Sequence, residues 1–202
     1  MTVPTSASPV PWYRRKAFWN LPNAITVFRV AMVPVVGFAL WTRPTFGWAV
    51  ASCVLFVVAM LSDILDGYLA RLWDVQSVAG AFLDPLADKL MMLTALVMMI
   101  PLGWVPAWAV VLMESRELAI SGLRMVAMSE GMVIAAGSLG KFKTSYQSTA
   151  VGFLLWHYPS IGIDAYSVGI LLFYVSLFFS LASAIEYFWG FYQYGKRART
   201  TA

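Results

Sequence analysis

Long stretches without a single charged residue restrict the fold of this chain more than any other feature. Each has close to the roughly 20 apolar residues that a helix needs to cross a lipid bilayer. Hydrophobic residues make up 60% of the chain and charged residues only 12%, which departs strongly from the composition of soluble domains. The uncharged stretches are residues 44–62, 90–113, 144–163 and 165–185. We therefore expect an all-α membrane protein.

Two further segments carry charges but are also expected to span the membrane. Residues 21–41 contain only Arg29, and residues 104–129 begin apolar and gather charges in their second half. The stretch 90–113 is long enough to contain the end of one span and the start of the next. The sequence thus predicts a polytopic protein with six transmembrane helices.

The beginning of the chain differs from the rest. Residues 1–11 are rich in proline and are expected to form a disordered tail. The basic and aromatic residues 12–19 are expected to form a short helix at the membrane interface. Because no linker separates two regions of different composition, we expect residues 1–202 to form a single membrane domain.

The distribution of lysine and arginine predicts the orientation, because these residues are retained in cytoplasmic loops. With six spans, nearly all of them fall on the same side as both termini, and only Arg43 lies opposite. We expect an integral protein of the bacterial cytoplasmic (inner) membrane with both termini cytoplasmic. The net charge of +4 then follows from topology and from contact with anionic lipid, without a nucleic-acid partner.

Four aspartates lie within or beside the predicted spans, where a charged side chain at the membrane centre costs about 2.5 to 3.5 kcal/mol. Asp63 and Asp66 are three residues apart, and Asp84 and Asp88 are four apart. Both spacings place two carboxylates on one face of a helix. Carboxylate oxygens are hard ligands that suit Mg²⁺ or Mn²⁺. The four aspartates therefore predict a site for divalent metal ions.

Small residues accompany these aspartates. Gly67, Ala70 and Gly80 remove side-chain bulk beside the carboxylates, so that a flat ligand such as a nucleotide can approach the backbone. Arg71 follows directly, and its planar guanidinium can bind a phosphate oxygen. Together these residues indicate a site for a nucleotide diphosphate.

Together, the aspartates, the small residues and Arg71 form a pattern that resembles the signature of the CDP-alcohol phosphotransferase family. The pattern is Asp63-x-x-Asp66-Gly67-x-x-Ala70-Arg71, eight residues, then Gly80-x-x-x-Asp84-x-x-x-Asp88. The resemblance implies a homodimeric six-helix membrane fold and two metal ions per active site, held by Asp63, Asp66, Asp84 and Asp88. It also implies that CMP is displaced from a CDP-linked lipid, with Asp88 as the general base.

Other segments resemble the branch of this family that makes phosphatidylglycerophosphate. They are residues 20–23, Thr26 and Arg29, residues 82–89, Ser115-Arg116-Glu117 and residues 140–144. This likeness implies that the substrates are CDP-diacylglycerol and glycerol 3-phosphate. We expect the CDP-lipid to be bound by the following residues: Asn23, Thr26, Gly67, Ala70, Arg71, Ser77 and Gly80.

The expected acceptor is an anion, so its phosphate needs cationic partners. Four basic residues are explained by neither the termini nor the signature: Arg116, Arg124, Lys141 and Lys143. Helical spacing places Glu117 and Arg124 on one face, which suggests that Glu117 orients Arg124 toward the bundle interior.

Several alternatives remain open from the residues alone. Buried acids also line the ion pathways of transporters, and the four cations equally suit a positive-inside topology. Arg29 and Thr26 could simply cap a helix or extend toward the inner interface. Within the family, the other acceptors to consider are inositol phosphate, serine and phosphatidylglycerol.

Overall fold

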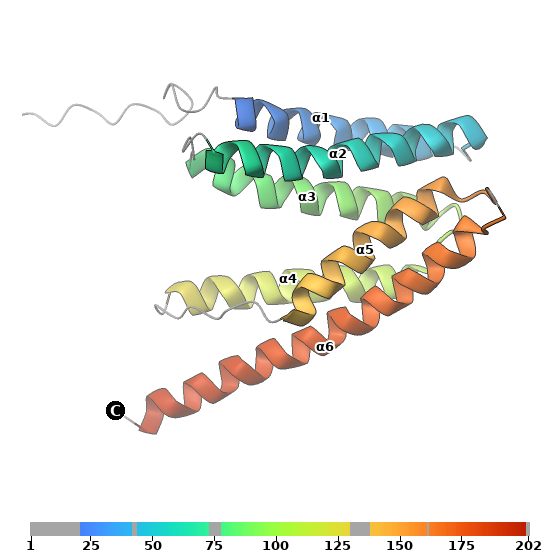
Figure 1. The fold of residues 1–202 in the computed structure, drawn as a ribbon. Helices are drawn as coiled ribbons and strands as arrows, with labels where there is room; N and C mark the ends of the chain where they lie inside the picture. Colours follow the sequence, from blue (N-terminus) through green and yellow to red (C-terminus); the bar gives the residue numbers. More distant parts are fainter. Residues whose placement is uncertain (1–20, 42–43, 73–77, 130–137, 161, 201–202) are drawn as a thin grey trace, which may run out of the picture.

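Six helices form the fold (Figure 1), and the computed structural model describes residues 21–41, 44–72, 78–129, 138–160 and 162–200. Within these residues the chain has no β-strand, and Ser160 and Ile163 form an isolated bridge. The all-α prediction is therefore confirmed. The helices are α1 (Leu21–Trp41), α2 (Phe46–Leu72), α3 (Val78–Met99), α4 (Ala107–Ser129), α5 (Ser138–Trp156) and α6 (Ala165–Thr200).

The helices agree with the predicted spans but extend beyond several of them. Helix α1 has the predicted bounds, whereas α2 continues past residue 62 and carries Asp63 and Asp66 in the same helix. Helix α5 begins at Ser138, before its uncharged stretch, and α6 continues to Thr200. An uncharged stretch marks the part of a helix that can lie in lipid. The backbone hydrogen bonds of the helix continue into the polar sequence beyond that stretch. The uncharged stretches therefore underestimated the lengths of α2 and α6, whereas α5 begins before its stretch and ends at Trp156, within it.

Two helices have the length and the apolar composition that a membrane span requires. The segments Ala24–Trp41 of α1 and Ala165–Gln193 of α6 are long and apolar enough to cross a bilayer, and Phe46–Ser62 of α2 is a shorter apolar segment. Large apolar side chains such as Phe38, Leu118 and Ile185 are more than two-thirds exposed. Such a surface is typical of a protein that contacts lipid or a partner. The predicted tail and interfacial helix in residues 1–19 lie outside the described residues.

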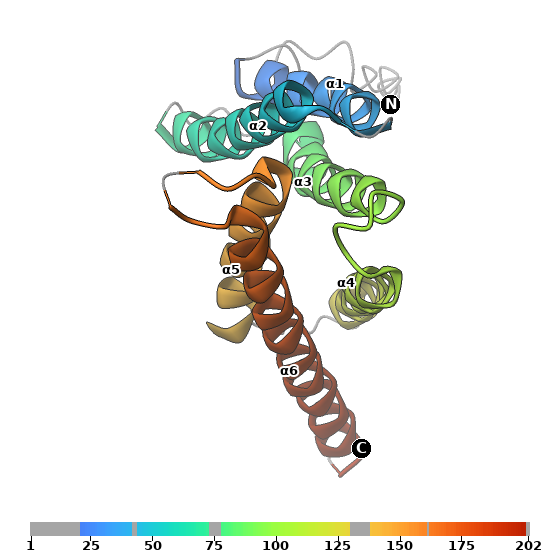
Figure 2. The same ribbon diagram turned by 90° about the vertical axis from the view of Figure 1, so that its right-hand side faces the viewer.

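Two groups of helices pack against each other. Helices α1, α2 and α3 lie side by side, and α5 packs along α6 in an antiparallel pair that also contacts α2 (Figures 1 and 2). Helix α4 lies beside α6 and contacts α3 only slightly. The beginning of α1 and the end of α6 lie at the same end of the bundle in Figure 1.

A glycine allows α5 and α6 to approach closely. A Cβ atom at Gly169 of α6 would lie 2.9 Å from both the backbone nitrogen and Cγ of Leu154 on α5. Leu154 is fully buried, as is Phe173 one turn beyond Gly169. Small residues at a helix interface of this kind increase the van der Waals contact that holds membrane helices together.

Candidate active site

Helix α1 presents two polar side chains to the two aspartates of α3. The Thr26 hydroxyl donates to Oδ1 of Asp84 at 2.5 Å, and Nη1 of Arg29 donates to Oδ1 of Asp88 at 3.1 Å. Thr26 and Arg29 are three residues apart, and Asp84 and Asp88 four apart, so each pair lies on one helix face. The packing of α1 along α3 therefore matches two polar positions with two carboxylates.

Arg29 is the most deeply placed of these groups, because only 1% of the residue is exposed. Its Nε also donates to the carbonyl oxygen of Ala59 on α2 at 3.1 Å. A single guanidinium thus connects α1, α2 and α3. The alternative in which Arg29 extends toward the interface is wrong, because the charge is buried and bound within the bundle.

The other two predicted metal ligands lie on α2. The helix is continuous through Asp63 and Asp66, but their side chains lie outside the described part of the structure. The described residues contain no group of three or more potential metal-ligating side chains. Asp84 and Asp88 on successive turns of α3 supply the hard oxygen donors that suit Mg²⁺ or Mn²⁺. The chemistry of these two described side chains therefore fits a divalent ion.

Several residues predicted to bind the CDP-lipid also have side chains that the structure does not describe. The side chains of Asn23, Gly67, Ala70, Arg71 and Gly80 lie outside the described part, although their helices are described. Ser77 lies outside the described residues altogether. Of the CDP-lipid set, the structure places only the Thr26 side chain, which lies against Asp84.

A cavity of about 230 Å³ opens beside Asp88 between α3, α4 and α5. Seven of its ten lining residues are polar or charged, which is unusual in the interior of a helical membrane protein. The lining residues are Met60, Pro85, Asp88, Lys89, Met92, Glu114, Glu117, Lys143, Thr144 and Gln147. The cavity thus brings one predicted catalytic residue, Asp88, and one predicted acceptor-binding residue, Lys143, to the same space.

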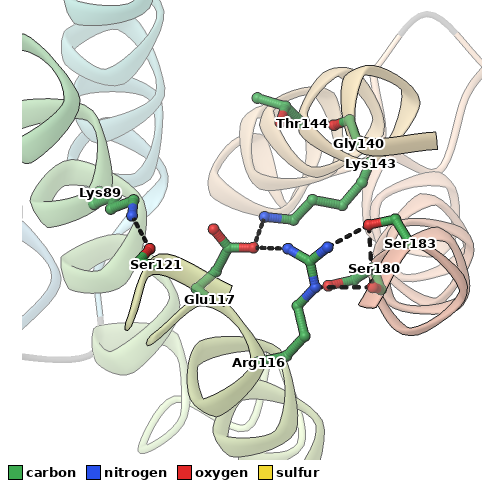
Figure 3. A network of polar contacts seen from close by, with 9 residues as sticks. All are labelled: Lys89, Arg116, Glu117, Ser121, Gly140, Lys143, Thr144, Ser180 and Ser183. Carbon is green, nitrogen blue, oxygen red and sulfur yellow. Dashed lines mark hydrogen bonds and ion pairs between the residues drawn. The ribbon is translucent and has the colours of Figure 1, made fainter. Parts of the chain in front are cut away.

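Lys143 belongs to a charged network centred on Glu117 (Figure 3). Oε1 of Glu117 accepts hydrogen bonds from Nζ of Lys143 at 2.5 Å and from Nη1 of Arg116 at 2.6 Å. Arg116 in turn donates from Nε to the carbonyl oxygen of Ser180 at 2.9 Å and from Nη2 to the Ser183 hydroxyl. The network joins α4 to both α5 and α6. Arg116 faces α6 and does not line the cavity described above.

Arg124 lies in a different environment. Its Nε donates to the Tyr187 hydroxyl at 3.3 Å, and its guanidinium carbon lies 5.6 Å from the centroid of that ring. The hypothesis that Glu117 orients Arg124 is wrong, since Glu117 binds Arg116 and Lys143. Seven residues along a helix correspond to a rise of about 10 Å, so Glu117 is closer to cations beside it and on a neighbouring helix.

Two further basic residues are Lys89 and Lys141, and the structure describes the side chain of Lys89 only. Lys89 lines the cavity and donates from Nζ to the Ser121 hydroxyl on α4 at 2.6 Å (Figure 3). Lys141 lies in the first turns of α5, and its side chain lies outside the described part. Of the four predicted acceptor-binding residues, Lys143 is the one whose described side chain reaches the cavity.

Sequence reasoning missed three polar residues of this cavity: Glu114, Thr144 and Gln147. Gln147 is four residues after Lys143 and therefore shares its face of α5. That spacing was a usable signal, but nothing in the sequence indicated which face of α5 turns toward α3.

Comparison with known proteins shows the family of this chain. The model of the family described as CDP-alcohol phosphatidyltransferase matches residues 19–182. The chain is 38% identical over 183 residues to the CDP-diacylglycerol--glycerol-3-phosphate 3-phosphatidyltransferase of Bacillus subtilis (strain 168), covering 84% of this chain and 94% of that protein. The proteins of the same name from Salmonella typhimurium and Haemophilus influenzae are 38% and 37% identical, each over 84% of this chain and 93% and 91% of their own lengths.

Proposed function

The chain belongs to the CDP-alcohol phosphatidyltransferase family, and on that premise we propose that it transfers the phosphatidyl group of CDP-diacylglycerol to glycerol 3-phosphate. The products are phosphatidylglycerophosphate and CMP, and the role is in phospholipid biosynthesis. The names of relatives that are 37 to 38% identical support this choice of substrates. The structural observation that carries it is the cavity in which Asp88 and Lys143 meet.

Asp63, Asp66, Asp84 and Asp88 would hold the divalent ions, two Mg²⁺ or Mn²⁺ per active site. When bound, the ions neutralise charge on the pyrophosphate and on the departing CMP. Thr26 fixes the orientation of the Asp84 carboxylate through its short hydrogen bond. A ligand fixed in this way loses less entropy on binding a metal.

Asp88 would also act as the general base. Its carboxylate takes the proton from the sn-1 hydroxyl of glycerol 3-phosphate as that oxygen attacks the phosphorus bearing the diacylglycerol. The P–O bond to CMP then breaks, and CMP leaves with the electron pair. Arg29 holds the Asp88 carboxylate in position through an ion pair at 3.1 Å. About a third of the Asp88 side chain is exposed, and the residue lines the cavity.

Lys143 would bind the phosphate of the acceptor. The ammonium group is a compact charge on a residue that is only 6% exposed, where a phosphate is attracted more strongly than in bulk water. Glu117 balances this charge before the acceptor enters. Arg116, Arg124 and Lys141 remain candidates for the same phosphate.

The nucleotide and lipid would lie on the α2 side of the aspartates. Arg71 would bind a phosphate of the CDP group, and the small residues would admit the nucleotide close to the backbone. The full set proposed for the CDP-lipid is Asn23, Thr26, Gly67, Ala70, Arg71, Ser77 and Gly80.

In the membrane, we propose six transmembrane helices in a single domain with both termini in the cytoplasm, and a homodimeric assembly in the bacterial inner membrane. The six described helices and their exposed apolar side chains support this arrangement. The same end of the bundle carries the beginning of α1 and the end of α6, as an even number of crossings requires.

Release of CMP from CDP-diacylglycerol by the purified protein tests the proposal. We expect release that requires both glycerol 3-phosphate and Mg²⁺ or Mn²⁺ and that is abolished in Asp66→Asn. The exposed Asp164 in the loop before α6 provides a matched control. Its oxygens accept hydrogen bonds from Tyr166 and Ser167, which asparagine can largely reproduce, so Asp164→Asn should retain activity.

The acceptor is tested by replacing glycerol 3-phosphate with inositol phosphate, serine or phosphatidylglycerol. CMP release with one of these and none with glycerol 3-phosphate would contradict the proposed acceptor. Ion flux through the protein in vesicles without any CMP release would instead show a transporter.

A further inference from the structure

One neutral polar group in the cavity is not explained by the chemistry above. Gln147 on α5 is only 3% exposed and lines the cavity beside Asp88 and Lys143. Within the part of the chain that the structure describes, its side-chain amide has no hydrogen-bond partner. The buried side-chain atoms without a partner in these residues are Nδ1 of His157 and Oγ of Ser180, so the Gln147 amide borders the cavity, where a ligand can reach it.

The position of Gln147 relates it to the acceptor. Lys143 and Gln147 are four residues apart and both face the cavity, which places them on successive turns of α5, roughly 5 Å apart along the helix axis. Asp88 lies on the opposite wall, on α3. A three-carbon alcohol phosphate bound with its phosphate at Lys143 would then extend along α5 past Gln147, with a terminal hydroxyl toward Asp88.

The other neutral side chains of the cavity are less suited to bind a hydroxyl. The Thr144 hydroxyl donates to the carbonyl oxygen of Gly140 in its own helix at 3.1 Å. Met60 and Met92 offer only weak acceptors. The Gln147 amide can donate one hydrogen bond and accept another, as a hydroxyl can, and its neutrality avoids repulsion of an anionic acceptor.

We propose that Gln147 binds the middle hydroxyl of the acceptor and makes the enzyme specific for a vicinal diol phosphate. This inference rests on the proposed function. Lys143 binds the phosphate, Asp88 takes the proton from the terminal hydroxyl, and the Gln147 amide hydrogen-bonds to the hydroxyl between them. A site built to bind a substrate hydroxyl discriminates strongly against an analogue that lacks it, because a buried polar group then stays unpaired.

The experiment compares glycerol 3-phosphate with 3-hydroxypropyl phosphate, which lacks the middle hydroxyl. For the wild-type enzyme we expect kcat/KM to be at least about tenfold higher with glycerol 3-phosphate. In Gln147→Leu, kcat/KM for glycerol 3-phosphate should fall by about that factor, while kcat/KM for 3-hydroxypropyl phosphate stays nearly constant. The ratio of the two values does not depend on how much of the protein is folded.

Gln147→Met provides a second variant of similar volume, in case the leucine variant does not fold. Gln193 near the end of α6 is exposed, so Gln193→Leu is the matched control and should keep the wild-type ratio. Equal losses for the two acceptors in both Gln147 variants would show a structural role and overturn the proposal. Wild-type kcat/KM values for both acceptors in the Gln147 variants would overturn it as well.

The same assay separates this inference from the proposed function. Wild-type CMP release with glycerol 3-phosphate supports the reaction regardless of what the Gln147 variants do. Absence of that release in the wild type would overturn the proposed function itself, and the role of Gln147 with it.

Discussion

Arg29 on α1 and Asp88 on α3 form an ion pair at 3.1 Å between positions 59 residues apart in the sequence. The same guanidinium is bound to the carbonyl oxygen of Ala59 on α2. A buried charge of this kind is tolerated only where it is paired and hydrogen-bonded. The pair therefore connects the helix scaffold to the carboxylate that we propose as the general base.

Arg29→Met should impair both folding and catalysis. Removal of one partner from a fully buried pair costs about 3 kcal/mol or more, and here the cost is smaller because about a third of the Asp88 side chain is exposed. We expect a lower melting temperature in detergent and a loss of CMP release of at least about 100-fold. Arg29→Lys keeps the charge but not the planar geometry that bridges Asp88 and Ala59, so it should recover stability better than activity. Wild-type activity in Arg29→Met would refute a role for the pair.

Thr26→Val should weaken the binding of metal by Asp84. Loss of a hydrogen bond to a ligating side chain commonly lowers metal affinity by about 10- to 100-fold. The Mg²⁺ concentration for half-maximal CMP release should rise within that range, and Thr26→Ser should stay close to wild type. Thr149→Val is a suitable control, because the Thr149 hydroxyl donates only to Ser145 in its own helix. Equal metal dependence of Thr26→Val and Thr149→Val would contradict the prediction.

Lys143→Met should raise the KM for glycerol 3-phosphate by about tenfold or more, with little change in the KM for CDP-diacylglycerol. The reason is the loss of a charge-assisted contact with the acceptor phosphate. Arg124→Met should leave the KM for glycerol 3-phosphate within about twofold and lower the melting temperature, since Arg124 contacts Tyr187 of α6. Steady-state kinetics of both variants checks this. A larger rise in KM in Arg124→Met than in Lys143→Met would reverse the assignment.

Gly169→Ala should destabilise the α5–α6 pair by about 1 to 3 kcal/mol through overpacking. Its new Cβ would meet Leu154 at 2.9 Å, including the backbone nitrogen, which cannot move easily. Gly190 lies in the same helix with open space around it, so Gly190→Ala should be neutral or stabilising. Thermal unfolding in detergent measures both variants. The close approach would be shown unimportant if the two variants melted at the same temperature.

His157 should make stability depend on pH. It follows α5, has a φ of 58°, and its ring stacks on Trp104 with centroids 4.0 Å apart. Burial lowers the pKa of His157 from its usual 6.5, and the charge of Asp164 opposes this in part. The folded state thus binds the proton less readily than the unfolded state, so stability is complete above pH 6.5 and is lost as the pH falls below it.

The measurement for His157 is the melting temperature between pH 7.5 and pH 5.5. The wild type should lose more stability over this interval than His157→Asn, which lacks the titrating ring and tolerates a positive φ. The pKa of Asp164 lies below its usual 3.8, mainly because of the hydrogen bond from Ser167, so Asp164 stays ionised over this interval and the difference isolates His157. Parallel curves for the two proteins would contradict the prediction.

Much of the fold follows from the sequence alone. Lack of charge over about 20 residues determines an apolar helix, because only a helix satisfies its own backbone within lipid. The all-α class was predicted on that basis, and the bounds of α1 were predicted from an apolar stretch that contains only Arg29 as a charged residue. The same sequence pattern places Asp84 and Asp88 on one face of α3, since helical periodicity is local.

Contacts between helices were decided only by the tertiary structure. The sequence predicted that four aspartates share one site, and the structure adds that Arg29 and Thr26 of α1 bind the two on α3. It also paired Glu117 with Lys143, 26 residues away, rather than with Arg124 on its own helix. Periodicity states which residues share a face but not which helix that face meets. That choice depends on close packing, as at Gly169, and it turned Gln147 toward the cavity beside Asp88.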